Sequence, residues 1–267
     1  MNAAIPRPLF RDANPERDLE VVQCGDERYL HFGDHLKQSA IDLARPDQLA
    51  LSYSRLMMTA LVLMATPPQR ILMIGLGGGS MARFLWRALP QAHVTVVERD
   101  PVMARVAFSY FELPQDPRLM VRLRDGARAF EPSPKRPYDL ILLDAFDPSG
   151  LAESIHCAKF LHKCRAHLSS DGVLAVNLTR SNKRRHGQAV NAIKAAFPEA
   201  HWRLPVAKFS NELRFAKSSV TNEWLLEPSL RTRAQTLNKE LSLDFPGFLA
   251  QMKRVNFPLW RRLRAGR

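Results

Sequence analysis

One stretch, residues 70–99, constrains the fold of this chain more than any other. It reads RILMIGLGGGSMARFLWRALPQAHVTVVER. An apolar run over 71–74 is typical of a parallel strand buried on both faces. Four glycines follow within five positions, then a helical segment over 81–89 that Pro90 ends, then a second apolar strand over 94–97. The stretch therefore predicts a strand–turn–helix–strand unit built around Gly75, Gly77, Gly78 and Gly79.

The glycine-rich turn predicts a nucleoside ligand. Glycine lets the backbone turn tightly and approach a ligand where a Cβ would collide. The backbone N–H groups at the turn and at the start of the helix face such a ligand. Glu98 ends the second strand about 20 residues further on, where an acid accepts hydrogen bonds from ribose hydroxyls. A βαβ unit without a ligand is the alternative, but it gives four clustered glycines no packing role.

The rest of the chain continues the same alternation of strands and helices. Strands are expected over 119–123, 138–143 and 173–178, and helices over 101–112, 154–168 and 186–197. Segments 201–206 and 212–216 are expected to close the sheet as an antiparallel pair. This order predicts an α/β fold with a mostly parallel sheet, helices on both faces and an antiparallel last strand.

The chain divides into three expected regions. Residues 1–45 form an N-terminal arm, loose over 1–17, and a small β module with strands over 18–24, 27–32 and 36–41. Residues 46–220 hold a linking helix, opened by Pro46, and the Rossmann domain. Residues 221–267 are expected to be a basic helical tail, because nine Lys/Arg stand against two Asp/Glu from residue 231 onward.

Composition sets broad limits on function. The formal net charge of +13 favours acidic partners in a non-specific way, and the basic tail is a candidate for weak anion or nucleic-acid contact. No apolar run approaches the length of a membrane span, so no membrane partner is expected. The N-terminus does not resemble a secretory signal, and three cysteines make no disulfide framework. A cytoplasmic location fits these features best.

Four carboxylates stand at or just after predicted strand ends: Glu98, Asp125, Asp144 and Asp147. Ligands of open α/β sheets bind outside the carboxyl ends of the strands, so these side chains are expected to surround one pocket. Asp125 suits the exocyclic amine of a base. Asp144 and Asp147 suit a cationic amine, as proton acceptor or charge partner. Asp125 and Asp147 have a simpler alternative role, the capping of turns.

No metal is expected. Histidines and cysteines do cluster on the helix predicted over 154–168, but their spacing does not match the compact spacing of zinc sites. We interpret them as core and surface side chains: His156, Cys157, His162, Cys164 and His167.

At this point the chain resembles a known family. The segments ILMIGLGGGSMARFL, VVERDP, RDGARAF and YDLILLDAFDP occur in the order seen in the methyltransferase-type Rossmann domain of spermidine synthases (polyamine aminopropyltransferases). The segment ERYLHFGDHLKQSAIDLARPDQLALSYSRLM resembles the small β module and linking helix that precede it in that family. The resemblance runs from about residue 18 to residue 216. It implies a transferase, expected as a homodimer, that carries an aminopropyl group from decarboxylated S-adenosylmethionine to a small amine.

The resemblance also implies a donor side of the site. Gln38 matches a glutamine at the thioether end of the nucleoside site, and Glu98 matches the acid that binds the ribose. Asp125, followed by Gly126, matches the aspartate that binds the adenine amine. The glycine turn matches the loop under the donor.

On the acceptor side, Asp144 matches the aspartate that deprotonates the attacking amine. Tyr53 and Asp147 match residues that line the amine substrate. The acceptor nitrogen attacks a carbon next to the sulfonium and releases methylthioadenosine, so catalysis is expected to combine positioning with removal of a proton.

The chain departs from the family pattern in ways that leave alternatives open. The family loop usually reads GGGDGG, and its aspartate falls at Gly78 here. Lys208 introduces a cation where the family has a proline- and tyrosine-containing loop. A methyltransferase that uses intact S-adenosylmethionine on a small or anionic acceptor is therefore the second interpretation. A non-catalytic nucleoside- or nucleic-acid-binding protein is the third.

Overall fold

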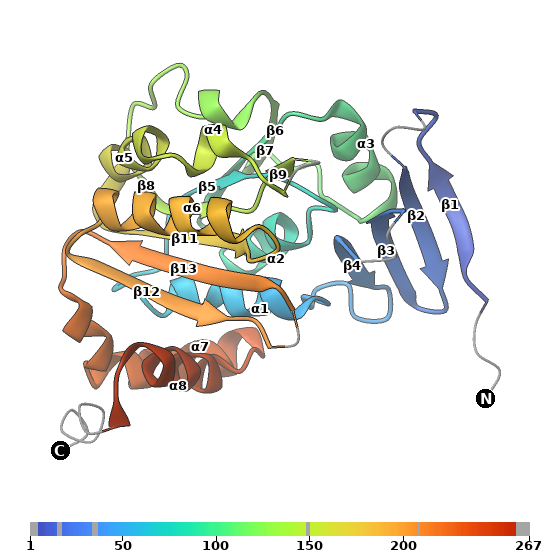
Figure 1. Ribbon diagram of the computed structural model, residues 1–267. Coiled ribbons are helices and arrows are strands. Elements are labelled where there is room, and N and C mark those ends of the chain that lie inside the picture. The colour runs from blue at the N-terminus through green and yellow to red at the C-terminus, as the bar shows by residue number, and fades with distance from the viewer. Residues whose placement is uncertain (1–4, 15–17, 34–36, 148–149, 208, 260–267) are drawn as a thin grey trace.

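The computed structural model describes residues 5–14, 18–33, 37–147, 150–207 and 209–259. A small antiparallel sheet lies beside a larger mixed sheet, which has helices on both faces (Figure 1). Within these residues, no helix is long and apolar enough to cross a membrane.

The small sheet holds four antiparallel strands in the order of the chain: β1 (Arg7–Arg11), β2 (Leu19–Cys24), β3 (Glu27–Phe32) and β4 (Ser39–Asp42). The prediction of a loose arm over 1–17 is wrong for residues 7–11, because β1 pairs with β2 and packs Leu9 and Phe10 against the core of this module. That core also takes in Met103, Val106 and Phe111, which follow much later in the chain.

The large sheet has the strand order β12-β13-β11-β8-β5-β6-β7. Strand β13 runs antiparallel to both of its neighbours, and the pairs from β11 to β7 are parallel, so the predicted fold class is confirmed. The strand bounds are β5 (Arg70–Ile74), β6 (His93–Glu98), β7 (Leu119–Leu123), β8 (Tyr138–Leu143), β11 (Leu168–Thr179), β12 (Ala200–Pro205) and β13 (Asn211–Lys217). A short pair, β9 (Phe146–Asp147) and β10 (Gly150–Leu151), follows β8.

Helices bury both faces of this sheet, which is why its central strands are apolar throughout. Asp100 caps α3 as its residue type predicts, because its side chain accepts a hydrogen bond from Val102 N. The helix predicted over 154–168 is two helices, interrupted at Cys157. The bounds are α2 (Ser80–Ala88), α3 (Pro101–Tyr110), α4 (Glu153–His156), α5 (Ala158–Ala166) and α6 (Lys183–Ala196).

The linking helix begins later than predicted. Helix α1 (Ser52–Met57) starts six residues after Pro46 and continues as the 3₁₀ helix η1 (Met58–Leu61). Pro46 instead lies in a turn, where its carbonyl accepts a hydrogen bond from the buried Arg83 guanidinium at 2.7 Å. A tertiary contact therefore decides the conformation at this proline.

The basic C-terminal region is an integral layer of the domain. Its elements η3 (Asn222–Leu226), α7 (Ser229–Leu241) and α8 (Phe245–Asn256) pack below β12 and η1 in Figure 1. Phe245, Leu249 and Met252 are buried in the main core. The Asn256 side chain bonds both the N–H and the carbonyl of Arg203, at 3.0 and 2.8 Å, which occupies the open edge of β12.

Candidate active site

Four of the predicted site features lie at the carboxyl ends of neighbouring strands of the large sheet. Strands β8, β5, β6 and β7 are neighbours in that order, and all four are parallel. Asp144, the glycine turn, Glu98 and Asp125 stand at their respective carboxyl ends. Three strand spacings separate the first from the last, or about 14 Å. This distance suits an adenosine group laid across the strand ends, with its base toward β7.

Three of the four glycines of the turn have a positive φ that favours glycine, and at Gly77 it is +53°. Gly75 has a φ of +95°, and a Cβ there would fall on the carbonyl oxygen of Asp144. Gly79 has a φ of +77° and is the residue before the first turn of α2. Side chains are strained at such φ values, so the sequence specifies this turn through glycine. The lack of a Cβ at Gly75 thereby lets the turn pack against the residue that follows β8.

Gly78 is enclosed by the small β module. Its N–H donates to Ser39 Oγ at 2.7 Å, and a Cβ would lie 2.9 Å from Ser39 Cβ and 3.0 Å from the Phe111 ring. Ser80 Oγ returns a second bond to the carbonyl of Ala40 at 3.1 Å. The expectation that the N–H groups of the turn face a ligand therefore does not hold at Gly78, because its N–H already donates to Ser39.

The Glu98 carboxylate holds the turn in place. One oxygen accepts from Leu76 N at 2.9 Å, and the other accepts from Asp100 N at 2.8 Å. The side chain is 9% exposed. Each carboxylate oxygen can accept more than one hydrogen bond, so Glu98 retains lone pairs for ribose hydroxyls.

Asp125 caps the short helix η2 (Gly126–Arg128) through a bond from Ala127 N at 2.7 Å. The capping role considered from the sequence is therefore present, and the exposed carboxylate retains further acceptor sites. A Cβ on Gly126 would lie 2.8 Å from Ile74, so the glycine allows η2 to sit against β5. Gln38 is exposed and directly precedes β4, beside the glycine turn.

The acceptor side centres on Asp144. Tyr53 Oη donates to one carboxylate oxygen at 3.2 Å, and Asn177 Nδ2 donates to the other at 2.8 Å. Asn211 Nδ2 in turn donates to the Asn177 side-chain oxygen at 3.0 Å. The structure therefore brings together side chains from α1, from the residue that follows β8, and from β11 and β13.

Burial is the main influence on protonation here. It raises the pKa of Asp144, and the hydrogen bonds from Asn177 and Tyr53 oppose this rise. Burial and the adjacent Asp144 charge raise the pKa of Tyr53 well above its ordinary value of 10.0. Tyr53 is thus a neutral donor, and Asp144 is a stronger base than an exposed carboxylate.

Sequence reasoning missed three polar residues of this site: Ser39, Asn177 and Asn211. Asn177 had a usable signal, since it is the single polar side chain in the buried run VLAVNL. Ser39 and Asn211 had none, because each acts on a residue more than 30 positions away. Asp147 lies in β9, and its side chain is outside the described residues, as is Lys208.

The described residues contain no group of three or more His, Cys, Asp or Glu side chains that could hold a metal ion. In the candidate cluster, Cys164 is buried against the core, and His162 and His167 bond backbone carbonyls of their own helix.

Comparison with known proteins identifies the family. The spermine/spermidine synthase domain matches residues 51–200, more than half of the 267 residues. A polyamine aminopropyltransferase of Neisseria meningitidis is 34% identical over 240 residues, which cover 90% of each chain. One of Chromobacterium violaceum is 32% identical over 247 residues, which cover 92% of each chain.

Two solved structures have folds similar to that of this chain. Spermidine synthase from Thermotoga maritima matches with a TM-score of 0.71 over 97% of this chain and 88% of that one, at 16% identity, which speaks for the fold alone. Human methyltransferase-like protein 13 in complex with SAH matches with a TM-score of 0.65 and 28% identity, over 72% of this chain and 93% of that one. The predicted fold and transferase class are thus confirmed, and the chain belongs to the spermine/spermidine synthase family.

Proposed function

We propose that this protein transfers the aminopropyl group of decarboxylated S-adenosylmethionine to the nitrogen of a small amine. The observation that carries the proposal is the position of Asp144, whose backbone contacts the glycine turn and whose carboxylate receives one donor on each oxygen. A nucleoside bound over the turn and Glu98 would then have its sulfonium end beside a carboxylate of raised pKa.

The chemistry assigned to these residues is simple. The amine nitrogen attacks the carbon next to the sulfonium, the carbon–sulfur bond breaks, and its electron pair stays on sulfur as methylthioadenosine leaves. The proton of the attacking nitrogen goes to Asp144. Tyr53 and Asn177 each donate one hydrogen bond to the carboxylate and so orient it. Each oxygen retains a further lone pair, and one of these accepts the proton. Catalysis then combines positioning of the two substrates with general base action.

A direct assay tests this function. The purified protein is incubated with decarboxylated S-adenosylmethionine and a panel of amines that includes putrescine, cadaverine and ω-amino acids. Mass spectrometry of the mixture then measures methylthioadenosine and the aminopropylated product. Equal amounts of both products with at least one amine support the proposal. Release of neither, with a folded protein and saturating substrates, contradicts it.

Methyl transfer is the second candidate, favoured by the absence of an acidic side chain at Gly78. The same assay with intact S-adenosylmethionine separates the two, because methyl transfer yields S-adenosylhomocysteine and a product heavier by one methyl group. Exclusive formation of these products would favour the methyltransferase.

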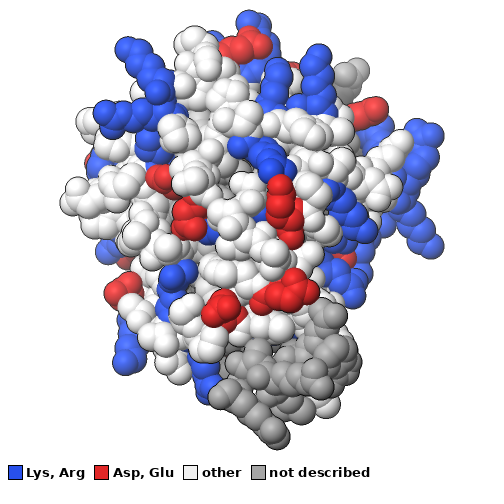
Figure 2. Space-filling model, turned by 90° about the vertical axis from the view of Figure 1, so that its left-hand side faces the viewer, with Lys and Arg blue, Asp and Glu red and all other residues white. Residues whose placement is uncertain are grey.

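Three finer expectations remain proposals. We expect a homodimer by family resemblance, which light scattering tests. A cytoplasmic location is consistent with the lack of a disulfide among the described cysteines, Cys24, Cys157 and Cys164. A weak anion contact of the C-terminal region depends on its exposed cations, and lysines and arginines on the face in Figure 2 are scattered among acidic and uncharged residues.

Truncation cannot test the anion contact, because removal of the residues after Leu230 would take away side chains that are buried in the main core. Conversion of three exposed cations to glutamine leaves that core intact: Arg231, Lys239 and Arg254. Weaker, salt-dependent heparin retention of this variant supports the contact, and unchanged retention removes it.

A further inference from the structure

The acceptor side contains a chain of side-chain amides that ends at Asp144. It runs from Asn211 through Asn177 to the carboxylate, with bonds of 3.0 and 2.8 Å. Asn177 is 1% exposed, whereas Asn211 is half-buried at the first position of β13. The chain therefore connects the partly buried Asp144 carboxylate with the turn between β12 and β13.

The charge of Asp144 fixes the orientation of both amides. An ionised carboxylate only accepts hydrogen bonds, so Asn177 must present its NH₂ group to Asp144 and its oxygen to Asn211. Asn211 must then turn its own NH₂ group toward Asn177. If Asn177 rotated by half a turn, its oxygen would face the carboxylate and disfavour the ionised form.

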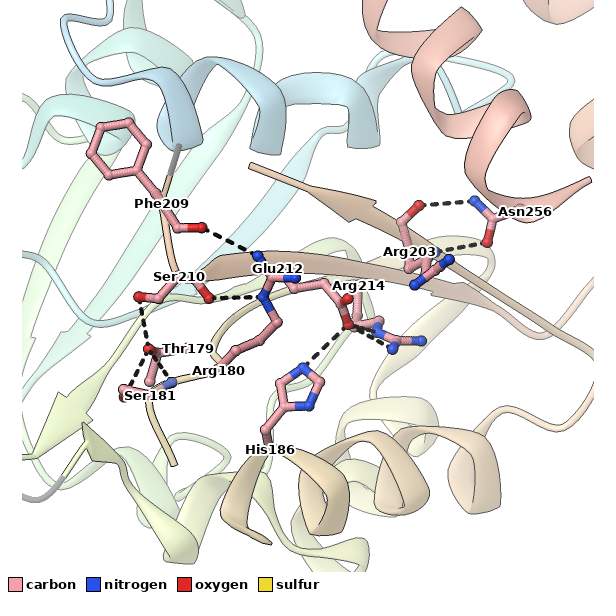
Figure 3. A network of polar contacts seen from close by, with 10 residues as sticks. All are labelled: Thr179, Arg180, Ser181, His186, Arg203, Phe209, Ser210, Glu212, Arg214 and Asn256. Atoms are coloured by element: carbon pink, nitrogen blue, oxygen red, sulfur yellow. Dashed lines mark hydrogen bonds and ion pairs between the residues drawn. The ribbon is translucent and has the colours of Figure 1, made fainter. Parts of the chain in front are cut away.

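The turn at the far end of the chain is anchored to the end of β11. The N–H of Arg180 donates to the Ser210 carbonyl at 2.9 Å, and its guanidinium donates to the Phe209 carbonyl at 3.3 Å. The Ser210 hydroxyl contacts Thr179 Oγ1 at 3.2 Å (Figure 3). Asn211 follows directly, and its carbonyl accepts from Val206 N at 3.0 Å. The position of the Asn211 amide thus depends on the position of this turn.

Among the described residues, Tyr53 from α1 is the only titratable side chain that forms a hydrogen bond with the Asp144 carboxylate. Burial and the adjacent Asp144 charge raise the pKa of Tyr53, so this side chain stays neutral. Asn177, from β11, is neutral at every pH. On the opposite face of β13, Glu212 is already bonded to His186 and Arg214 (Figure 3).

We propose that Asn211 is a positioning residue, which orients the Asn177 amide and thereby keeps Asp144 ionised and correctly placed to accept the proton of the amine. Asp144 acts as the base only within the proposed function, so the mechanistic part of this inference rests on that function. The effect of Asn211 on the charge of Asp144 does not.

The test measures the carboxyl group of Asp144 in the protein without substrates. Aspartate labelled with ¹³C at the carboxyl carbon is followed by NMR as pH varies, and the Asp144→Asn variant identifies the signal. Asn211→Ala should raise the pKa of Asp144 by about one pH unit, the size expected for loss of a supporting hydrogen bond. Asn211→Asp should raise it further, because its ionised carboxylate accepts from Asn177 and turns the Asn177 oxygen toward Asp144.

Asn191→Ala is the matched control, since Asn191 is an exposed asparagine on α6. Asn211→Asp is nearly isosteric with the native residue, so it carries the test if Asn211→Ala does not fold. Identical titration of Asp144 in the control and in both Asn211 variants would overturn the proposal, as would a lowered pKa.

A kinetic arm connects the effect to turnover. The acid limb of the kcat profile should move to higher pH in Asn211→Ala by the same amount as the NMR titration, while KM for the donor stays unchanged. Absence of any transfer activity in the wild type would count against the proposed function and leave the titration result standing. A moved titration with an unmoved kcat profile would overturn the mechanistic part.

Discussion

The two sides of the candidate site are constructed differently. Apart from Gln38, the donor side consists of the glycine turn, Glu98 and Asp125, which lie within 51 consecutive residues at the ends of neighbouring parallel strands. The acceptor side takes Tyr53, Asp144, Asn177 and Asn211 from four segments that tertiary structure brings together. Donor residues are held mainly by backbone groups close to them in the chain or at the next strand, whereas acceptor residues hold one another through side chains.

This difference predicts which property a substitution on each side should change. A substitution on the donor side disturbs a turn that we propose also binds the ligand, so affinity and stability should fall together. A substitution on the acceptor side removes a partner from a partly buried charge, so turnover and its pH dependence should change while donor affinity stays. The following predictions test this separation.

The largest expected effect is on turnover. Asp144→Asn keeps the shape of the side chain but removes the proton acceptor, so kcat for aminopropyl transfer should fall by about 10²–10⁴-fold. Affinity for methylthioadenosine, measured by calorimetry, should change little because the carboxylate is on the acceptor side. An equal loss of affinity and turnover would contradict the separation of the site into a donor side and an acceptor side.

The next effect is on donor affinity. Glu98→Ala removes the acceptor for the N–H groups of Leu76 and Asp100 and the expected partner of the ribose. A hydrogen bond to a charged group contributes about 1.5–3 kcal/mol, so methylthioadenosine should bind about 10- to 100-fold more weakly. Thermal unfolding should show a lower Tm as well. Weaker binding at unchanged Tm would mean that Glu98 contacts the ligand without supporting the turn.

A smaller effect concerns the contact between the glycine turn and the β module. Gly78→Ala places a Cβ about 3 Å from Ser39 and Phe111, and overpacking of this kind costs about 1–3 kcal/mol of unfolding free energy. Gly187 is the control, because a Cβ there meets nothing within 4 Å and helix α6 favours alanine. Gly187→Ala should therefore be neutral or stabilising in urea denaturation.

The contact of Gly78 with Ser39 and Phe111 also determines how donor specificity can be tested. Gly78→Asp alone would bury a carboxylate against Ser39 and Phe111, so it should unfold the protein more readily rather than change donor preference. The double variant Gly78→Asp/Ser39→Gly removes the nearest obstacle. If the acid then faces the donor, this variant should discriminate against intact S-adenosylmethionine more sharply than the wild type, which competition binding measures.

The smallest effect is on stability as a function of pH. The pKa of Asp144 is raised in the folded state above its ordinary value of 3.8. Above pH 3.8 the unfolded chain therefore loses this proton more readily than the folded protein does, and the free energy of unfolding decreases. Asp144→Asn lacks this decrease. Its Tm should match that of the wild type at low pH, exceed it increasingly as the pH rises above 3.8, and keep a constant advantage above the raised pKa. A wild-type advantage at neutral pH would show that the bonds to Tyr53 and Asn177 outweigh burial.

The sequence by itself determined the fold class and the donor side. Buried parallel strands need continuous apolar runs, and glycine alone adopts positive φ without strain, so residues 70–99 specify their local structure. The nucleoside site that they predict remains a proposal. The order of strand ends then placed Glu98, Asp125 and Asp144 on one edge, because parallel strands bring their carboxyl ends together.

Only the tertiary structure decided the amide contacts of the acceptor side, the start of the linking helix and the place of the basic C-terminal region. Asn177 and Asn211 meet because β13 pairs antiparallel with β11, and no local pattern encodes that register. Arg83 holds the turn at Pro46 from a distant helix, and Phe245 and Met252 find the main core only after the sheet exists. Hydrogen bonds and apolar contacts between residues far apart in sequence depend on the folded arrangement, which is why composition and local spacing could not reveal them.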